Sequence, residues 1–338
     1  LDEVVSWCEE LDLHIILDNH TFHPVKPTDK KVDRVLLKVW PQMASRYKDR
    51  SDLVVYEILN EPHGIDGKKW SRIQGEVIEA IRAIDPRHAI IVGPANYNTY
   101  HDLDTLPVYE DKNLIYTFHF YDPFIFTHQG ARWGEPSLGD LAGVPYPPDP
   151  AKMPPVPKSL KGGWYEGIIK RYGVEGTPER VMALLDIAAR FSEERKVPVF
   201  CGEFGVYMTN ADPAQRVEWY RQVRTYLESR GIAWTTWDYE GPFGLFERGE
   251  GGSFGSDLNI PLIEALGYRI PPQAERVSAP ERGPVDIYRD HAGVDIIAST
   301  HPLGGTIDLY SKDNPASGTY AFTIADCDQY AFVKFGFR

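Results

Sequence analysis

The chain alternates between short apolar runs and longer amphipathic stretches from its start to about residue 267. The short runs are rich in Val, Ile and Leu, which is typical of strands buried on both faces. The longer stretches carry apolar residues at helical spacing, as Ile73, Val77 and Ile81 do within 68–84. We therefore predict six strands, within residues 13–20, 54–61, 88–93, 114–121, 197–206 and 231–240.

Helices are predicted over residues 1–11, 28–47 and 68–84, the second of them despite Pro41. Thr177-Pro178 and Asp212-Pro213 predict two further helix starts, because a capping side chain followed by proline suits the first helical turn. Regular alternation of strands and helices favours a parallel α/β sheet, and its length favours a (β/α)8 TIM barrel over residues 1–270.

Six units are two fewer than an eight-stranded barrel needs. No further unit precedes Leu1, so we expect the first two barrel strands to be missing from this chain or supplied from elsewhere. Residues 122–165 form a long insert rich in Pro, Gly and Trp, which we expect to wall a binding cleft.

The composition changes beyond the predicted barrel. Residues 271–284 are rich in Pro and charge and predict a linker. Residues 285–338 show short alternating segments and turn residues, which predict a β-sandwich-like segment. This segment is interpreted either as part of a carbohydrate-binding module or as structural support for the barrel, and 330–338 alternatively as a barrel strand of a permuted chain.

Charge and cysteine content exclude several classes of partner. The formal charge is −13 and the pI is about 5.3, which argues against nucleic acid, whereas a neutral polysaccharide is compatible. No apolar run reaches the ~20 residues of a membrane span. Cys8, Cys201 and Cys327 are too widely spaced for a zinc site or a disulfide framework.

Polar side chains stand where four predicted strands end. Parallel strands of a barrel bring their carboxyl ends to one face, so these side chains should meet in one cleft. Glu61 and Glu203 would form a carboxylate pair of the kind that hydrolyses glycosides. The side chains are His20, Asn60, Glu61, His119, Tyr121 and Glu203.

These segments resemble the family-five glycoside hydrolases, the cellulase family. The resemblance covers about residues 1–267 and rests on Leu59-Asn60-Glu61-Pro62, Gly202-Glu203-Phe204-Gly205, His119-Phe120-Tyr121, His20 and Trp237. It implies a (β/α)8 barrel that hydrolyses β-linked glycans with retention and without a cofactor. The family's arginine at the end of barrel strand two has no counterpart in this chain.

The resemblance also implies a role for each residue. Glu61 would be the acid/base and Glu203 the nucleophile, so Glu61 should be protonated near neutral pH and Glu203 ionised. Asn60 would bind the sugar 2-hydroxyl, and Tyr121 would hold the carboxylate of Glu203. His20, His119 and Trp237 would line the subsite of the cleaved sugar, and Trp133 is a further candidate for sugar stacking, with packing under the insert as its alternative.

We expect a secreted, monomeric, endo-acting β-1,4-glucanase whose partner is a β-linked polysaccharide. β-Mannanase, xyloglucanase and β-1,3-glucanase activities remain alternatives on the same core, as do a carbohydrate-binding barrel without activity and a metal-dependent hydrolase. Glu57, which shares strand parity with Glu61, is expected to be an internal hydrogen-bonded carboxylate. Cys201 shares parity with Glu203, so a buried thiol is expected directly below the nucleophile.

Overall fold

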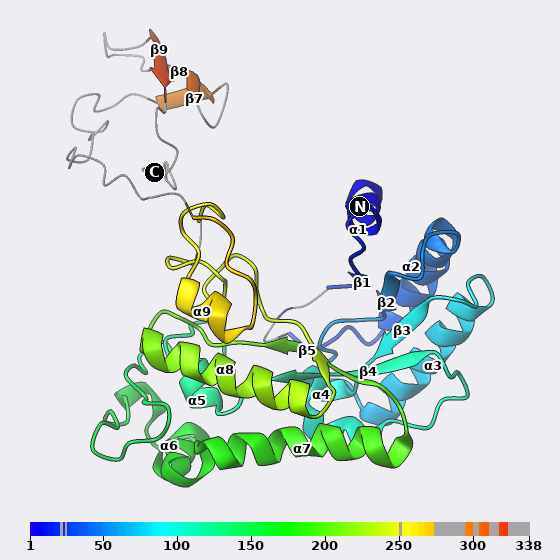
Figure 1. Ribbon diagram of the computed structural model, residues 1–338, viewed down its shortest axis with the longest axis horizontal. Helices are drawn as coiled ribbons and strands as arrows, with labels where there is room; N and C mark the ends of the chain where they lie inside the picture. The colour runs from blue at the N-terminus through cyan, green and yellow to red at the C-terminus, as the bar shows by residue number, and fades with distance from the viewer. Residues whose placement is uncertain are drawn as a thin grey trace.

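The computed structural model describes residues 1–20, 23, 26–249, 252–273, 295–299, 304–310 and 318–323. All six predicted strands are present, and they form one parallel sheet in the order β1-β2-β3-β4-β5-β6 (Figure 1). The predicted α/β barrel architecture is confirmed as a curled, partial (β/α)8 barrel. The strands are β1 (Ile15–Asp18), β2 (Val54–Glu57), β3 (Ala89–Val92), β4 (Leu114–Phe120), β5 (Val199–Phe204) and β6 (Ala233–Trp234).

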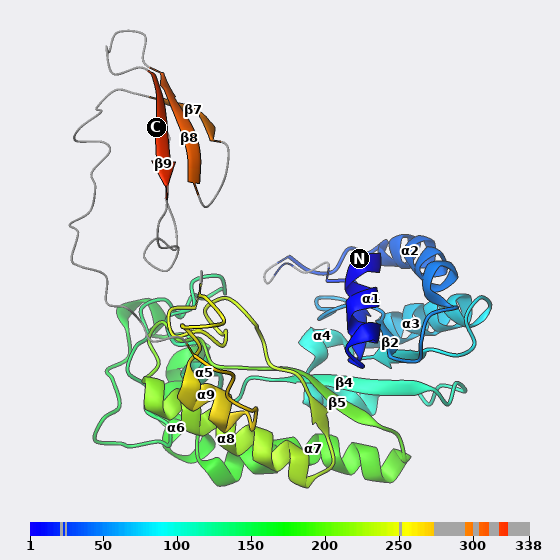
Figure 2. The same cartoon turned by 45° about the horizontal axis from the view of Figure 1, so that its top comes forward.

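Long helices cover the outer face of this sheet. In Figures 1 and 2, α2 and α3 lie beside the first strands and α7 and α8 beside the last. The long helices are α1 (Asp2–Glu10), α2 (Val32–Tyr47), α3 (Gly67–Arg82), α6 (Trp164–Glu175), α7 (Pro178–Arg195) and α8 (Pro213–Ser229). The short ones are α4 (Ala95–Asn98), η1 (Tyr100–Thr105), α5 (Phe124–Thr127), η2 (Lys158–Leu160) and α9 (Ile260–Ala265).

Local side-chain chemistry sets several helix starts. Thr177 and Asp212 cap α7 and α8 by accepting backbone hydrogen bonds, as predicted. The second helix begins at Val32, four residues later than predicted, because the side chain of Asp29 accepts from the amide of Lys31 and stabilises a turn there.

The two faces of the sheet bury different residues. Tyr56, Phe118 and Cys201 face outward into the main hydrophobic core beneath the helices. Their neighbours along the strands face inward and form a small apolar layer, made of Val55, Ile91 and Phe200 with Ile16, Ala89 and Ile115 against them. Side chains alternate along a strand, so the next inward-facing residues of each strand lie above this layer, at the carboxyl end of the sheet.

A bulge in β5 interrupts this alternation just before Glu203. Phe118 pairs with Cys201, but the next residue, His119, pairs with Glu203, so Gly202 is the extra residue. The expectation that Cys201 lies below Glu203 on the same face is therefore wrong: the thiol points into the outer core while the carboxylate points inward. A Cβ atom on Gly202 would lie 2.6 Å from Oγ1 of Thr117, so only glycine fits at this bulge.

The sheet curls far enough to bring its two edge strands together at the carboxyl end. The ring of His20, two residues past β1, stacks on Trp237, three residues past β6, with centroids 5.2 Å apart and planes 4° from parallel. In the described part of the chain, no backbone pairing joins β1 to β6. The edges of the sheet are thus linked by side chains rather than by a ladder.

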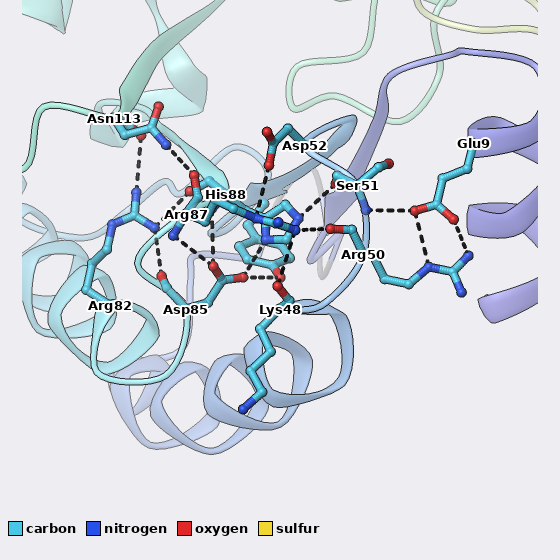
Figure 3. A network of polar contacts seen from close by, with 11 residues as sticks. Glu9, Lys48, Arg50, Ser51, Asp52, Arg82, Asp85, Arg87, His88 and Asn113 are labelled. Atoms are coloured by element: carbon cyan, nitrogen blue, oxygen red, sulfur yellow. Dashed lines mark hydrogen bonds and ion pairs between the residues drawn. The ribbon is translucent and has the colours of Figure 1, made fainter.

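A polar network ties the strands together at their amino ends (Figure 3). Asp85 is fully buried, and its carboxylate accepts from the Tyr56 hydroxyl at 2.8 Å and contacts Nδ1 of His88 at 2.6 Å. The other ring nitrogen of His88 contacts the backbone oxygen of Ser51 at 2.9 Å. Burial alone would raise the pKa of Asp85, but the amide of Arg87 and these side chains hold it below its usual value.

Beyond the barrel, three antiparallel strands pair in the order β7-β8-β9. They are β7 (Asp295–Ser299), β8 (Gly304–Tyr310) and β9 (Gly318–Thr323). Most of the predicted linker, the alternative barrel strand at 330–338 and Cys327 lie outside the described residues. Among the helices that the structure describes, none is long and apolar enough to cross a membrane.

Candidate active site

Glu61 lies just past the end of β2, on a turn that points its side chain into the cleft. Backbone pairing with the β1 segment continues past the end of β2, where the amide of Asn60 donates to the backbone oxygen of Asn19. Glu61 itself adopts φ +43°, an uncommon conformation for a residue with a side chain. Its Oε1 lies 2.7 Å from Nδ1 of His119, the inward residue near the end of β4.

Glu203 enters the same cleft from the bulge in β5. The hydroxyl of Tyr121 donates to its Oε2 at 2.8 Å, and Nδ1 of His119 lies 3.3 Å from the same oxygen. The facing oxygen atoms of Glu61 and Glu203 are within 4.8 Å of each other. Three strands thus bring Glu61, His119, Tyr121 and Glu203 together, as the sequence predicts.

The buried carboxylates control the charge of His119. Burial alone would lower the pKa of His119, but the charges of Glu203 and Glu61 and the hydrogen bond to Glu61 raise it to about 9. The imidazole is therefore protonated at neutral pH, and its Nδ1–H is shared between the two carboxylates.

The titration of Glu203 differs from the expectation that donors keep it fully ionised. Burial raises its pKa to about 7, and the charge of Glu61 adds to this effect. His119 and the Tyr121 hydroxyl act in the opposite direction, but they do not outweigh burial. Glu203 is therefore partly protonated at neutral pH.

Glu57 does not match the expected hydrogen-bonded carboxylate. It faces the interior directly below Glu61 and Glu203, its side chain is buried, and Oε1 has no hydrogen-bond partner among the described residues. Burial and the neighbouring charge of Asp18, its partner across the β1–β2 ladder, raise its pKa to about 8. Glu57 is thus a neutral carboxylic acid at pH 7.

The residues predicted to contact the cleaved sugar surround the pair on one side. Nε2 of His20 lies 3.2 Å from Nδ2 of Asn60, and the other ring nitrogen of His20 contacts Asp18 at 2.7 Å. Trp237 stacks on His20. Asp18, whose carboxylate fixes the His20 ring, was not among the predicted site residues; its position two residues before His20 on one strand face was the available signal.

Trp133, from the long insert, packs against a different group of aromatic residues. Its ring contacts Tyr207 edge-on at 4.9 Å and lies 6.1 Å from both His128 and Phe243, whose rings pack against Tyr121. The Trp133 side chain is 40% exposed. The insert therefore lies next to Tyr121 and presents an accessible aromatic face there.

Glu61, His119 and Glu203 are also compact enough to be considered as metal ligands. However, the imidazole atom in this group is Nδ1, which carries the proton shared with the carboxylates. The hydrogen bonds account for the arrangement, and we assign no metal site. Within the described ranges, no other group of three such residues is this close.

Asn98 is a second residue that sequence reasoning did not find. It is fully buried at the end of α4, with its amide 3.5 Å from Nε2 of His119. The only signal in the sequence is its position shortly after the end of β3, where an Asn-Tyr-Asn segment follows Gly93-Pro94-Ala95.

Comparison with known proteins identifies the family of this chain. A family model described as "Cellulase (glycosyl hydrolase family 5)" matches residues 1–241. The chain belongs to this family. The predicted resemblance is thereby confirmed, and the match includes β1 to β6.

Relatives of this family 5 chain include named endoglucanases. Endoglucanase 3 of Fibrobacter succinogenes is 30% identical over 266 residues, which are 74% of this chain but 40% of that protein. Endoglucanase C of Acetivibrio thermocellus is 29% identical over 250 residues, covering 71% of this chain and 72% of that protein. The endoglucanase of Thermotoga maritima, solved with cellobiose, is 30% identical with a TM-score of 0.62, covering 78% and 76% of the two chains.

Proposed function

We propose that this family 5 chain is a retaining, endo-acting β-glucanase that cleaves β-1,4-linked glucan. The observation that supports the proposal best is the separation of its two carboxylates, whose facing oxygens are within 4.8 Å. Retaining glycosidases hold the two groups about 5–5.5 Å apart, whereas inverting enzymes leave about 6.5–9.5 Å for a water molecule.

In the proposed mechanism, ionised Glu203 attacks the anomeric carbon while protonated Glu61 gives its proton to the leaving oxygen. The glycosidic C–O bond breaks and a glycosyl ester of Glu203 forms. Glu61, now ionised, takes a proton from water, which attacks the ester and releases the sugar with its original configuration. His119 Nδ1–H, within reach of both carboxylates, offers a path by which a proton passes from Glu203 to Glu61 before the attack.

The stereochemistry of the first product tests the mechanism directly. Proton NMR of cellopentaose hydrolysis should show the β-anomer of the new reducing end before mutarotation. Early appearance of the α-anomer would instead mean inversion, and the assignment of Glu203 as a nucleophile would fail.

Two variants test the separate roles of the carboxylates. Glu203→Gln should lose about 10³-fold or more in kcat on every substrate, because no ester can form. Glu61→Gln should lose similar activity on cellulose but keep much of the glycosylation rate on a dinitrophenyl β-cellobioside, whose leaving group needs no acid. If the two variants respond alike to the leaving group, the roles are assigned wrongly.

A second candidate substrate is β-mannan. The Thermotoga maritima enzyme, 29% identical to this chain in that structure, has also been solved with mannotriose. Product analysis on cellulose, glucomannan, xyloglucan and laminarin distinguishes these substrates, and cleavage of mannan alone would overturn the glucanase proposal.

The proposal extends to the organisation of the protein. Residues 1–270 would be the catalytic barrel and 285–338 a separate β-rich segment, supported by the antiparallel pairing of β7, β8 and β9. Secretion as a monomer would suit an enzyme whose substrate is an extracellular polymer. Expression of residues 1–270 alone tests the division, since an independent barrel should unfold cooperatively and keep its activity on soluble substrates.

A further inference from the structure

The segment after β3 has an unusual backbone. Asn96, Tyr97 and Asn98 all adopt left-handed conformations, with φ values of 67°, 63° and 52°. L-residues normally visit this region singly, so three in succession must be held by their surroundings. The amide of Tyr97 donates to the backbone oxygen of Pro62, next to Glu61, and Thr99 forms an isolated bridge with His119.

This left-handed turn (Asn96–Asn98) places one side chain in the interior. Asn98 is completely buried, and its Nδ2 lies 3.5 Å from Nε2 of His119. Its Oδ1 lies against the backbone of Gly93, and a Cβ atom added to Gly93 would lie only 2.5 Å from this oxygen. Oδ1 has no hydrogen-bond partner among the described residues. Glycine at position 93 thus leaves the space that the amide occupies.

The amide and the imidazole match each other in either state of the ring. Nδ1 of His119 always carries the proton that it shares with Glu61 and Glu203. Nε2 is therefore an acceptor in the neutral ring and a donor in the imidazolium. In the present orientation, the Asn98 amide donates N–H to Nε2 of the neutral ring. Rotation of the amide by 180° about its Cβ–Cγ bond would instead turn Oδ1 toward Nε2–H of the imidazolium, and the two orientations occupy almost the same space.

We propose that Asn98 is a positioning residue that holds the ring of His119 from its far side, so that Nδ1–H stays aimed between Glu61 and Glu203. The left-handed turn is the device that brings the amide there. The catalytic effect of Asn98 rests on the proposed glycosidase function. The contact between Asn98 and His119 is independent of that function.

Paired substitutions within the same turn test this proposal. Asn98→Asp keeps the size and the tolerance of left-handed backbone, but its carboxylate can only accept a hydrogen bond from Nε2–H. Asn96→Asp makes the same chemical change at an exposed position, where the side chain bonds Asp102 at the surface. The other charged groups that act on His119, which are Glu57, Glu61 and Glu203, are the same in both variants.

The first readout is the titration of His119, followed by ¹⁵N NMR of histidine-labelled full-length chain. Asn98→Asp should raise the midpoint of His119 by about one pH unit, and Asn96→Asp should leave it within about 0.2 unit. An unchanged midpoint in Asn98→Asp, or an equal shift in both variants, would overturn the proposal.

The second readout is kinetic. Asn98→Ala should lower kcat on an aryl β-cellobioside about 10- to 100-fold with KM within about twofold, because the ring is no longer held in place. If Asn98→Ala does not fold, Asn98→Asp supports the same comparison, and a kcat equal to that of Asn96→Asp would contradict the role. A wild-type chain that hydrolyses no glycoside would refute the proposed function, while the NMR comparison would still decide the positioning role.

Discussion

The phenol of Tyr121 donates a 2.8 Å hydrogen bond to Oε2 of Glu203, across the gap between β4 and β5. Glu203 is buried and Tyr121 is partly buried, so the bond acts in a medium where hydrogen bonds to charge are strong. It favours the ionised form of a carboxylate whose surroundings otherwise favour the protonated form.

Removal of this hydroxyl should therefore change both the rate and the pH dependence. Tyr121→Phe should lower kcat about 10- to 100-fold, since the donor also stabilises the carboxylate that leaves in the second step. Loss of the donor raises the pKa of Glu203, so the acidic limb of kcat/KM should move to higher pH. Tyr109→Phe, which loses a hydroxyl bonded to Gln74 outside the cleft, is the control. An acidic limb that stays in place would contradict the argument.

The neutral acid Glu57 predicts a pH-dependent stability. Its pKa is about 8 in the fold and about 4.5 in the unfolded chain, so between these values the folded protein alone holds the proton. Unfolding then releases a proton, and stability falls as the pH rises from 4.5 to 8. Glu57→Gln should be no more stable than wild type at pH 4.5, but more stable at pH 8 by roughly 2 kcal/mol or more.

Thermal unfolding of both proteins between pH 4.5 and 8 measures this difference. Glu79→Gln, an exposed change on α3, should show no such trend. A gap between wild type and Glu57→Gln that is constant with pH would mean that Glu57 does not titrate in this range.

The network at the amino ends of the strands predicts a stability defect without a catalytic one. Asp85→Ala would leave His88 and the Tyr56 hydroxyl buried without their partner, so the free energy of unfolding should fall by about 3–5 kcal/mol. Asp52→Ala removes an exposed ion pair with Arg87 and should cost less than about 1 kcal/mol. Urea unfolding gives both values, and kcat of Asp85→Ala below its unfolding transition should stay within about threefold of wild type. A larger loss of kcat would show that the two ends of the sheet are coupled.

Trp133 predicts a dependence on substrate length. Its accessible ring is separated from Tyr121 by His128 and Phe243, so we expect it to stack on sugars away from the cleavage point. Trp133→Ala should raise KM for cellohexaose about 10-fold, corresponding to the loss of one stacking contact, and leave an aryl β-cellobioside nearly unchanged. Trp7→Ala, which removes an equally accessible ring from α1, should affect neither substrate. Equal changes on both substrates would indicate that Trp133 supports the fold of the insert.

The sequence predicted the elements that follow from periodicity and capping. Every strand, the starts of α7 and α8, and the meeting of Glu61, His119, Tyr121 and Glu203 depend on short-range patterns and on the rule that parallel strands end at one face. The late start of α2 was missed because a local hydrogen bond from Asp29 overrides helix propensity.

What the sequence could not give was set by tertiary packing. Strict alternation placed Cys201 with Glu203, and the bulge that separates them requires knowledge of the β4 partner. The raised pKa values of Glu57 and Glu203 depend on burial that neighbouring strands create. Asn98 belongs to a turn of three successive left-handed residues; asparagine tolerates this conformation singly, but residue propensity does not predict three in a row.

The bulge at Gly202 means that the position of Glu203 is encoded by the backbone conformation of β5 as well as by residue type. If Gly202 took a regular place in the ladder, strict alternation would put Glu203 on the face of Cys201, toward the helices, although no chemical group of the site would be removed. Among homologous chains, any larger residue at this position should therefore harm activity more surely than several substitutions around it, because its Cβ atom would meet Thr117 and disturb the bulge. An inactive descendant could arise by exchange of this one glycine while every polar residue of the site remained in its sequence.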